Sequence, residues 1–231
     1  MIQSRHAAIS AVLLTGAAVV GVRQRALRRE LDSTRVELAD VRQRAFRDRL
    51  TGLANRDAIE IELARRASGS QPYAVVLVDL DAFKPVNDTH GHAAGDVVLA
   101  EAARRLSAVV DPRTDLVGRL GGDEFVILAS SPLGLISRQL GQDAAKAMRR
   151  PVSITDDLQV TVPASVGVLH AMPGDCERAV MRSADVALYR AKAAGGDRVV
   201  EFGPAAPLAT VAQERPRVRL REGGALVEVT R

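Results

Sequence analysis

The chain has 231 residues, of which 47% are hydrophobic, and its formal net charge is +4. This length allows one full domain with appendages, and the hydrophobic fraction is sufficient for a buried core. The modest charge, the absence of Trp and the presence of only two Tyr residues argue against a nucleic-acid partner. A single cysteine, Cys176, excludes an internal disulfide and fits a reducing, cytosolic location for the domain.

The first element in chain order is an uncharged apolar run over residues 7–22, with a heavier arginine flank on its carboxyl side than on its amino side. We expect residues 1–23 to form a single-pass membrane anchor that leaves the rest of the chain in the cytoplasm. A cleaved signal peptide is one alternative. A helix packed within a soluble, cytoplasmic protein is the other.

A heptad-like pattern follows over residues 24–46. Apolar or small residues alternate at spacings of four and three, with charged residues around them. The pattern predicts a coiled-coil linker that joins two copies of the chain as a parallel homodimer. A single amphipathic helix lying against the domain is the alternative. The residues of this seam are Leu27, Leu31, Thr34, Leu38, Val41 and Ala45.

Hydrophobic periodicity and turn residues then predict an α+β domain over residues 47–203, an α/β sandwich. We expect a central, mostly antiparallel five-stranded sheet with helices around it. The segment 204–231 reads as a linker followed by a possible terminal β-hairpin. The expected strands lie near residues 74–79, 116–120, 124–129, 160–169 and 198–202, and the expected helices are Arg56–Ala67, Ala94–Val110, Gly134–Ala147 and Cys176–Ala193.

Acidic residues follow two of these strands closely. The buried strand at 74–79 ends in Asp79, with Asp81 two residues later, and a Gly121-Gly122 turn carries Asp123 and Glu124. Carboxylates at the end of a buried strand need a cation, donors or water. If the strand lies beside the turn, these acids form a set of hard oxygen ligands suited to Mg²⁺.

These residues belong to a set of motifs that resembles the GGDEF-domain diguanylate cyclases. The resemblance extends over about 155 residues, the size of one typical domain. It implies a palm-like fold similar to that of nucleotide polymerases. The motifs lie at residues 48–56, 79–84, 87–88, 91–92, 95–96, 119–125, 165–167 and 184–192.

The resemblance implies that the protein is a bacterial enzyme that condenses two GTP molecules into cyclic di-GMP and two pyrophosphates, with two Mg²⁺ ions per active site and Mn²⁺ as a substitute. It implies catalytic roles for Asp123 and Glu124. The implied metal ligands are Asp79, Asp123, Glu124 and the backbone carbonyl of Leu80. The implied substrate-binding residues are Phe83, Lys84, Asn87, Asp96, Gly121, Gly122, Lys192 and Arg198, with Asn87 and Asp96 at the guanine edge and both lysines at phosphates.

Two other hypotheses for the function stay open: a catalytically silent regulator that binds GTP or cyclic di-GMP, and a membrane-tethered dimerisation scaffold.

The sequence also departs from the family pattern at two places. Pro112 stands where the inhibitory product site has its arginine, although Asp115 remains, so we expect no such allosteric site. Gly196 stands where a phosphate-facing arginine is usual, with Arg198 as the possible substitute.

Overall fold

The computed structural model describes residues 23–24, 27–37, 41, 45–131 and 135–203. The chain divides into two compact units, residues 1–45 and residues 46–231. Residues 1–22 of the predicted anchor, and the linker and hairpin predicted at residues 204–231, lie outside the described residues. In the part of the chain that is described, no helix has both the length and the apolar character needed to cross a membrane.

In the first unit, residues 27–37 form a helix whose side chains are exposed. Leu27 and Leu31, two members of the predicted seam, are 51% and 57% exposed. The Thr34 hydroxyl donates a hydrogen bond to the Glu30 carbonyl within the helix, at 2.9 Å. The helix is therefore confirmed over these residues, and its pairing with a second copy stays a prediction.

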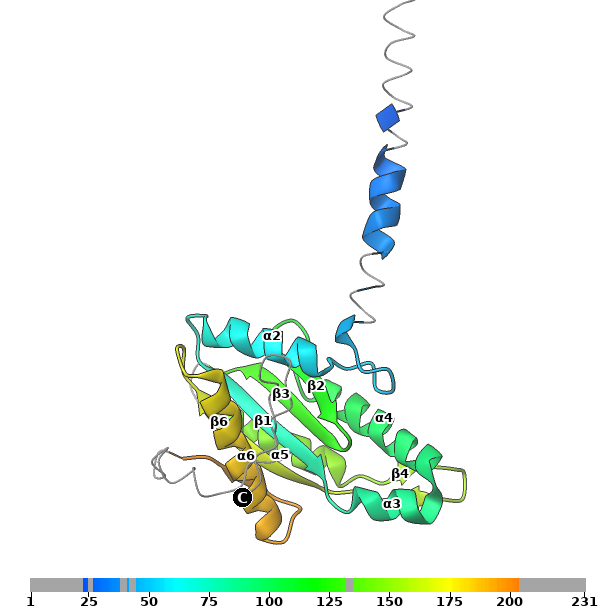
Figure 1. Ribbon diagram of the computed structural model, residues 1–231. Helices are drawn as coiled ribbons and strands as arrows, with labels where there is room; N and C mark the ends of the chain where they lie inside the picture. The colour runs from blue at the N-terminus through cyan, green and yellow to red at the C-terminus, as the bar shows by residue number, and fades with distance from the viewer. Residues whose placement is uncertain (1–22, 25–26, 38–40, 42–44, 132–134, 204–231) are drawn as a thin grey trace, which may run out of the picture. The chain divides into compact units, whose positions relative to one another are not determined.

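The second unit is built on a five-stranded sheet with the order β2-β3-β1-β6-β7 (Figure 1). Neighbouring strands run antiparallel except for β6 and β7, which run parallel. The mostly antiparallel five-stranded sheet is as predicted. Its strands are β1 (Tyr73–Leu80), β2 (Leu116–Gly121), β3 (Glu124–Ser130), β6 (Ala164–Ala171) and β7 (Val199–Glu201).

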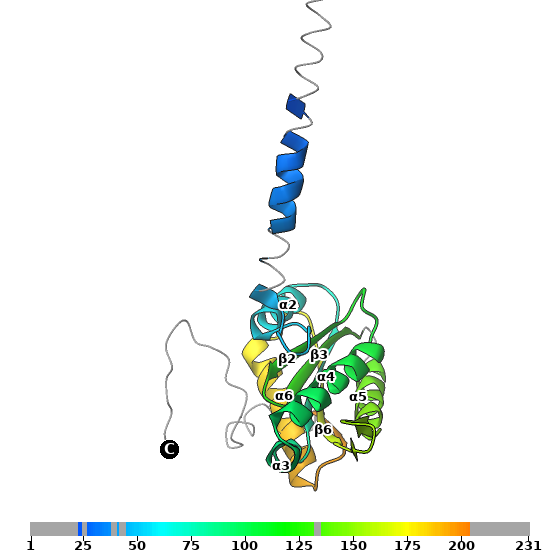
Figure 2. The same ribbon diagram turned by 90° about the vertical axis from the view of Figure 1, so that its right-hand side faces the viewer.

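Two pairs of helices cover the two faces of this sheet. Helices α2 (Arg56–Ala67) and α6 (Glu177–Ala193) pack on one face, and α4 (His92–Ala108) and α5 (Leu135–Met148) pack on the other (Figure 2). All eight residues of the central strand β1 are buried. Because side chains alternate along a strand, Val75 and Leu77 join the core under α2 and α6, while Val76 and Val78 join the other core. Asp79 lies two residues after Leu77, so its side chain is on the same face of β1 and faces α6.

The structure divides one predicted strand and adds one helix that was not predicted. A strand was expected near 160–169 with Pro163 at its start or edge, and β6 does begin directly after Pro163, but β5 (Gln159–Val160) pairs with β4 (Val152–Ser153) in a separate two-stranded sheet. Pro163 has no N–H to donate to the sheet. Helix α3 (Phe83–His90) was not among the expected helices. Pro85 lies in the first turn of the helix, where no N–H is needed.

The N-terminal turn, residues 48–55, covers the free edge of the sheet beside β2. The Ala54 amide donates to the Val117 carbonyl at 3.2 Å, and the Arg119 amide donates to the Ala54 carbonyl at 2.8 Å. These bonds give the edge strand a partner. The chain leading into the domain is therefore bonded directly to the strand that precedes the acidic turn.

Candidate functional site

The three predicted acids meet at one end of the central strands. Asp79 lies directly opposite Glu124 in the β1–β3 pairing. The Leu80 amide donates to the Asp123 carbonyl at 3.3 Å. Gly121 and Gly122 adopt φ values of +145° and +55°, which favour glycine, and they make the tight turn between β2 and β3. The predicted hairpin therefore brings Asp123 and Glu124 to the carboxyl end of β1.

Asp79 is the most enclosed of these acids, with 5% of its surface exposed. Its carboxylate forms an ion pair with the ammonium group of Lys192 on α6. Burial raises the pKa of Asp79, and the hydrogen bond from Lys192 acts in the opposite direction. The structure thus joins Asp79 and Lys192, which lie 113 positions apart in the numbering of the chain, in one charged contact.

A cavity of about 250 Å³ opens beside this ion pair, between the end of β1 and the last turns of α6. Burial raises the pKa of Glu124, and the nearby charge of Asp79 adds to this effect. Asp185 of α6 lines the same cavity and is 5% exposed. Asp185 was not among the predicted site residues, although its spacing of seven residues from Lys192 places both on one face of a helix. The lining residues are Asp79, Glu124, Asp185, Leu188, Tyr189, Lys192 and Ala193.

The donor chemistry of this site fits Mg²⁺. Within the described residues, no three or more His, Cys, Asp or Glu side chains form a ready-made metal site. Asp79 is nevertheless paired with Glu124 across β1 and β3, and the Leu80 amide bonds to the Asp123 carbonyl, so the residues that carry the three carboxylates are neighbours. Carboxylate oxygens of this kind are the ligands that Mg²⁺ prefers, and a cation there would offset their mutual repulsion.

The predicted guanine-reading residues lie on the two helices that follow β1. Asn87 belongs to α3 and Asp96 to α4. A Cβ atom built on Gly95 would lie 1.9 Å from the Asn87 side-chain oxygen, so the amide packs directly on the backbone of α4. Lys84 is exposed. The Phe83 ring is 9% exposed and belongs to the core, so its side chain is structural.

The turn after α6 accounts for the glycine at position 196. Gly196 has a φ of +74°, and a Cβ atom there would lie 3.0 Å from a carboxylate oxygen of Asp81. An arginine at this position would therefore be strained in this structure. The Arg198 side chain folds back on the same turn, where its Nε donates to the Gly196 carbonyl at 2.9 Å.

Arg119 lies beside the acidic turn and was not among the predicted site residues. Its guanidinium donates to the Gly122 carbonyl at 2.7 Å and contacts the Asp48 carboxylate at 3.1 Å. Burial opposes ionisation of Asp48, but hydrogen bonds from Thr51 and Arg119 lower its pKa overall. The sequence feature that could have indicated a role for Arg119 is its charge, which stands alone in the otherwise uncharged strand 116–120.

Asp115 is occupied within its own loop. Its carboxylate accepts hydrogen bonds from the amides of Asp111 and Ser130, both at 3.1 Å. Arg113 points its guanidinium at Asp111, at 2.7 Å. Pro112 is exposed and supplies neither charge nor donor. Asp115 thus connects this loop to the end of β3.

Comparison with known families decides the classification. The family described as "Diguanylate cyclase, GGDEF domain" matches residues 45–198, a range that includes the acids of β1, the acidic turn and Lys192. The chain belongs to this GGDEF family. Diguanylate cyclase TpbB from Pseudomonas aeruginosa is 36% identical over 189 residues, which are 77% of this chain and 43% of that protein. The chain spans about a fifth to two fifths of the length of the curated relatives it matches.

Solved structures of GGDEF proteins share the fold. Diguanylate cyclase SiaD from P. aeruginosa, solved with its activator SiaC, has a TM-score of 0.71 and 30% identity, covering 87% of this chain and 78% of that one. The coiled coil and GGDEF domain of DgcB from Caulobacter crescentus, solved with c-di-GMP, has a TM-score of 0.70 and 28% identity. It covers 79% of this chain and 98% of that one. The palm-like GGDEF fold expected from the sequence is confirmed.

Proposed function

We propose that this GGDEF domain is a diguanylate cyclase, which condenses two GTP molecules into cyclic di-GMP and releases two pyrophosphates. The observation that carries the proposal is the meeting of Asp79, Asp123 and Glu124 at the end of β1, with Lys192 in contact with Asp79. Attack of a ribose 3′-hydroxyl on the α-phosphate of GTP requires carboxylates that can hold metal ions and a cation that can contact the phosphates. Family membership and the named cyclases among the relatives support the same reading.

In this proposal Asp79, Asp123, Glu124 and the Leu80 carbonyl hold two Mg²⁺ ions, with Mn²⁺ as a substitute. Bound there, the ions would stabilise the charge that develops on the reacting oxygens and ease deprotonation of the 3′-hydroxyl. Asp123 lies at the turn and would orient the attacking hydroxyl. Gly121 and Gly122, which have no side chains, would let the backbone approach the nucleotide closely.

We divide the residues that would bind GTP into a set that contacts the guanine base and a set that contacts the phosphates. Asn87 and Asp96 would bind the guanine edge, because an amide and a carboxylate together match its acceptor and donor groups. Lys84, Lys192 and Arg198 would hold phosphates as cations, and Phe83 would contribute its backbone. Gly196 supplies no cation to the triphosphate, which favours as second candidate a catalytically silent regulator that binds GTP or cyclic di-GMP.

Each domain would bind one GTP, so two copies must meet for the two 3′-hydroxyls to attack. The seam on helix 27–37 would supply this pairing by raising the effective concentration of the domains. The anchor predicted at residues 7–22 would place the pair at a bacterial cell membrane. Pro112 and the occupied Asp115 lead us to propose that this chain lacks the family's inhibitory product site.

The test is to incubate the full-length protein with GTP and Mg²⁺ and to identify the product by chromatography and mass. We expect cyclic di-GMP and pyrophosphate in a ratio of one to two. With 3′-deoxy-GTP, which lacks the attacking hydroxyl, we expect no product. GTP binding without any product would instead favour the silent regulator, and no binding at all would favour a scaffold that only dimerises.

A further inference from the structure

The carboxylate of Asp81 holds the turn that follows α6. One oxygen accepts a hydrogen bond from the Ser165 hydroxyl and the other from the Asp197 amide, both at 2.7 Å. Ser165 is fully buried in β6, next to β1. Through these two hydrogen bonds, Asp81 connects strand β6 of the sheet to a turn 116 residues away in the sequence.

The same turn is also held by Arg149, the residue that follows α5. The Arg149 guanidinium donates to the Asp197 carboxylate at 2.8 Å and to the Asp197 carbonyl at 3.0 Å. Asp197 has a φ of +48°, an uncommon conformation for a residue with a side chain. Asp81, which follows β1, and Arg149, which follows α5, thus both form hydrogen bonds with Asp197.

The backbone between this residue and Lys192 leaves little freedom. Gly195 donates to the Lys192 carbonyl at 3.0 Å, and Gly196 donates to the Ala191 carbonyl at 3.1 Å. These two bonds form the capping arrangement that commonly ends a helix at a glycine. The position of Lys192 therefore depends on the turn that Asp81 and Arg149 hold.

Two acids at the end of β1 act on the same helix end in different ways. Asp79 contacts the Lys192 side chain, and Asp81 contacts the backbone five residues later. We infer that Asp81 is a positioning residue, which acts through the α6 turn to keep Lys192 at the metal and phosphate site. Arg149 supports it through Asp197. This inference rests on the proposed function, because the role of Lys192 toward phosphate belongs to that proposal.

The test measures binding of 3′-deoxy-GTP with Mg²⁺ to the full-length protein by calorimetry, since this nucleotide cannot react. Asp81→Ala should raise the dissociation constant about tenfold, because small displacements of a binding group have large effects. In a Lys192→Ala background, the same change should alter it less than about twofold, because Asp81 would act through a group already absent. Equal factors in both backgrounds, or no weakening in either, would overturn the inference.

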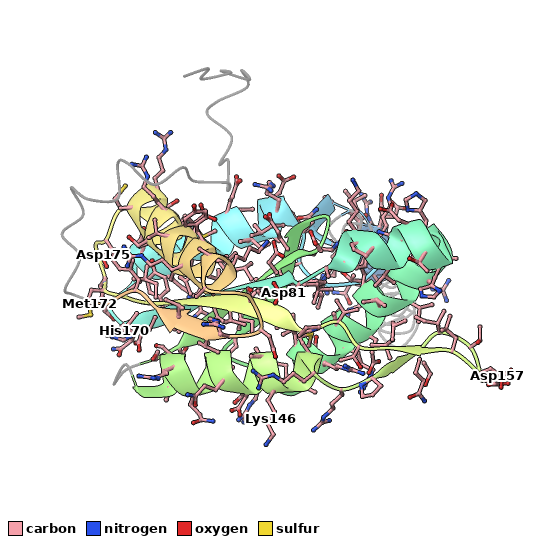
Figure 3. The ribbon with its side chains drawn as sticks, turned by 90° about the horizontal axis from the view of Figure 1, so that it is seen from below. Asp81, Lys146, Asp157, His170, Met172 and Asp175 are labelled. Carbon is pink, nitrogen blue, oxygen red and sulfur yellow. The ribbon has the colours of Figure 1, made fainter. Side chains whose placement is uncertain are left out.

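Asp175 offers a matched control. Its carboxylate accepts a hydrogen bond from the Met172 amide at 2.7 Å, so it also holds a turn, but in the loop after the far end of β6 (Figure 3). Asp175→Ala should leave nucleotide affinity unchanged. If it weakens binding as much as Asp81→Ala, the effect is general destabilisation and the inference fails.

A second measurement separates this inference from the proposed function. Asp81→Asn preserves size but replaces one acceptor by a donor, and we expect faster amide hydrogen exchange at residues 195–198 than in the unmodified protein. Asp175→Asn should not change exchange there. If the unmodified protein binds no GTP, the proposed function fails, and exchange alone then decides the role of Asp81. Unchanged exchange at residues 195–198 in Asp81→Asn would contradict the hold on the turn.

Discussion

Arg119 lies between the N-terminal turn and the acidic turn, 3.1 Å from the carboxylate of Asp48. The same guanidinium donates twice to the Gly122 carbonyl, at 2.7 and 2.9 Å. The side chains of Arg119 and Asp48 are 13% and 24% exposed, so the pair is mostly removed from solvent. One arginine therefore fixes the glycine turn to the segment through which the chain enters the domain.

The first prediction follows from this contact. Arg119→Ala should lower the free energy of unfolding by about 2 kcal/mol, because charge-assisted hydrogen bonds of a mostly buried group are lost. Urea denaturation of the full-length protein measures this change. Arg113→Ala is the control, since Arg113 is 86% exposed and its pair with Asp111 lies on the surface. It should change the free energy of unfolding much less than Arg119→Ala does, because exposed ion pairs contribute little. Equal losses in the two variants would contradict the assignment.

The contact between Asn87 and Gly95 gives a second prediction. Gly95→Ala should displace the Asn87 amide, because the new Cβ would lie 1.9 Å from its oxygen. We expect the preference for GTP over ATP to fall as much as in Asn87→Ala, by about tenfold or more, since a site made to hydrogen-bond its ligand loses discrimination with one partner. Initial rates or competition binding with both nucleotides measure this preference. The neighbouring change Ala93→Gly at an exposed position is the control, and an unaltered preference in Gly95→Ala would remove Asn87 from guanine recognition.

Helix α4 provides a prediction about pH. Hydrogen bonds from Arg104, and further ones from Arg105, lower the pKa of Glu101 to about 2. A lowered carboxyl pKa stabilises the fold above the unfolded-state value of 4.5, and this contribution is lost as the pH falls toward about 2. Glu101→Gln should therefore lower the free energy of unfolding by about 1 kcal/mol at pH 7, given partial exposure to solvent.

Denaturation at several pH values tests whether the stabilisation by Glu101 decreases as the pH falls. The difference between the unmodified protein and Glu101→Gln should shrink as the pH falls below 4.5. Asp111→Asn, in the exposed pair with Arg113, should show a smaller difference throughout. A difference that grows on acidification would show that the Glu101 pairs do not contribute as described.

The exposed helix 27–37 allows a prediction about assembly. Leu31→Glu should reduce self-association of the full-length protein in detergent, because like charges would meet across the seam of a parallel pair. Val36→Glu is a matched control on the same helix, since Val36 is 69% exposed and lies off the seam. Sedimentation equilibrium measures both. Loss of association in both variants, or in neither, would contradict the seam defined by Leu27 and Leu31.

The site could be predicted from the sequence where local patterns place its residues. A buried strand ending at Asp79 and a glycine turn ahead of Asp123 and Glu124 are visible in short windows, and the structure places these acids together. Helix α3 was not predicted, because its residues form a polar stretch, although Pro85 is compatible with a helix in its first turn. Proline was informative at Pro163, which was expected at the start or edge of its strand, and β6 begins directly after it.

Long-range polar contacts could not be predicted in this way. Arg119 contacts Asp48 across 71 residues, and Asp81 contacts the Asp197 amide across 116. Neither contact has a periodic signature, because each depends on how distant elements pack. The close approach of Gly196 to Asp81 is likewise a tertiary fact that explains a departure from the family pattern.

The most direct test of the central claim compares Asp123→Asn with the unmodified full-length protein in the presence of GTP and Mg²⁺. The substitution keeps the size of the side chain and removes its charge. Asp57→Asn, at an exposed position on α2, is the control. We predict that the unmodified protein and Asp57→Asn make cyclic di-GMP, and that Asp123→Asn makes it at least about 100-fold more slowly, the usual scale for losing one electrostatic contribution to the transition state. Equal rates in all three proteins, or no cyclic di-GMP from the unmodified protein, would contradict the claim.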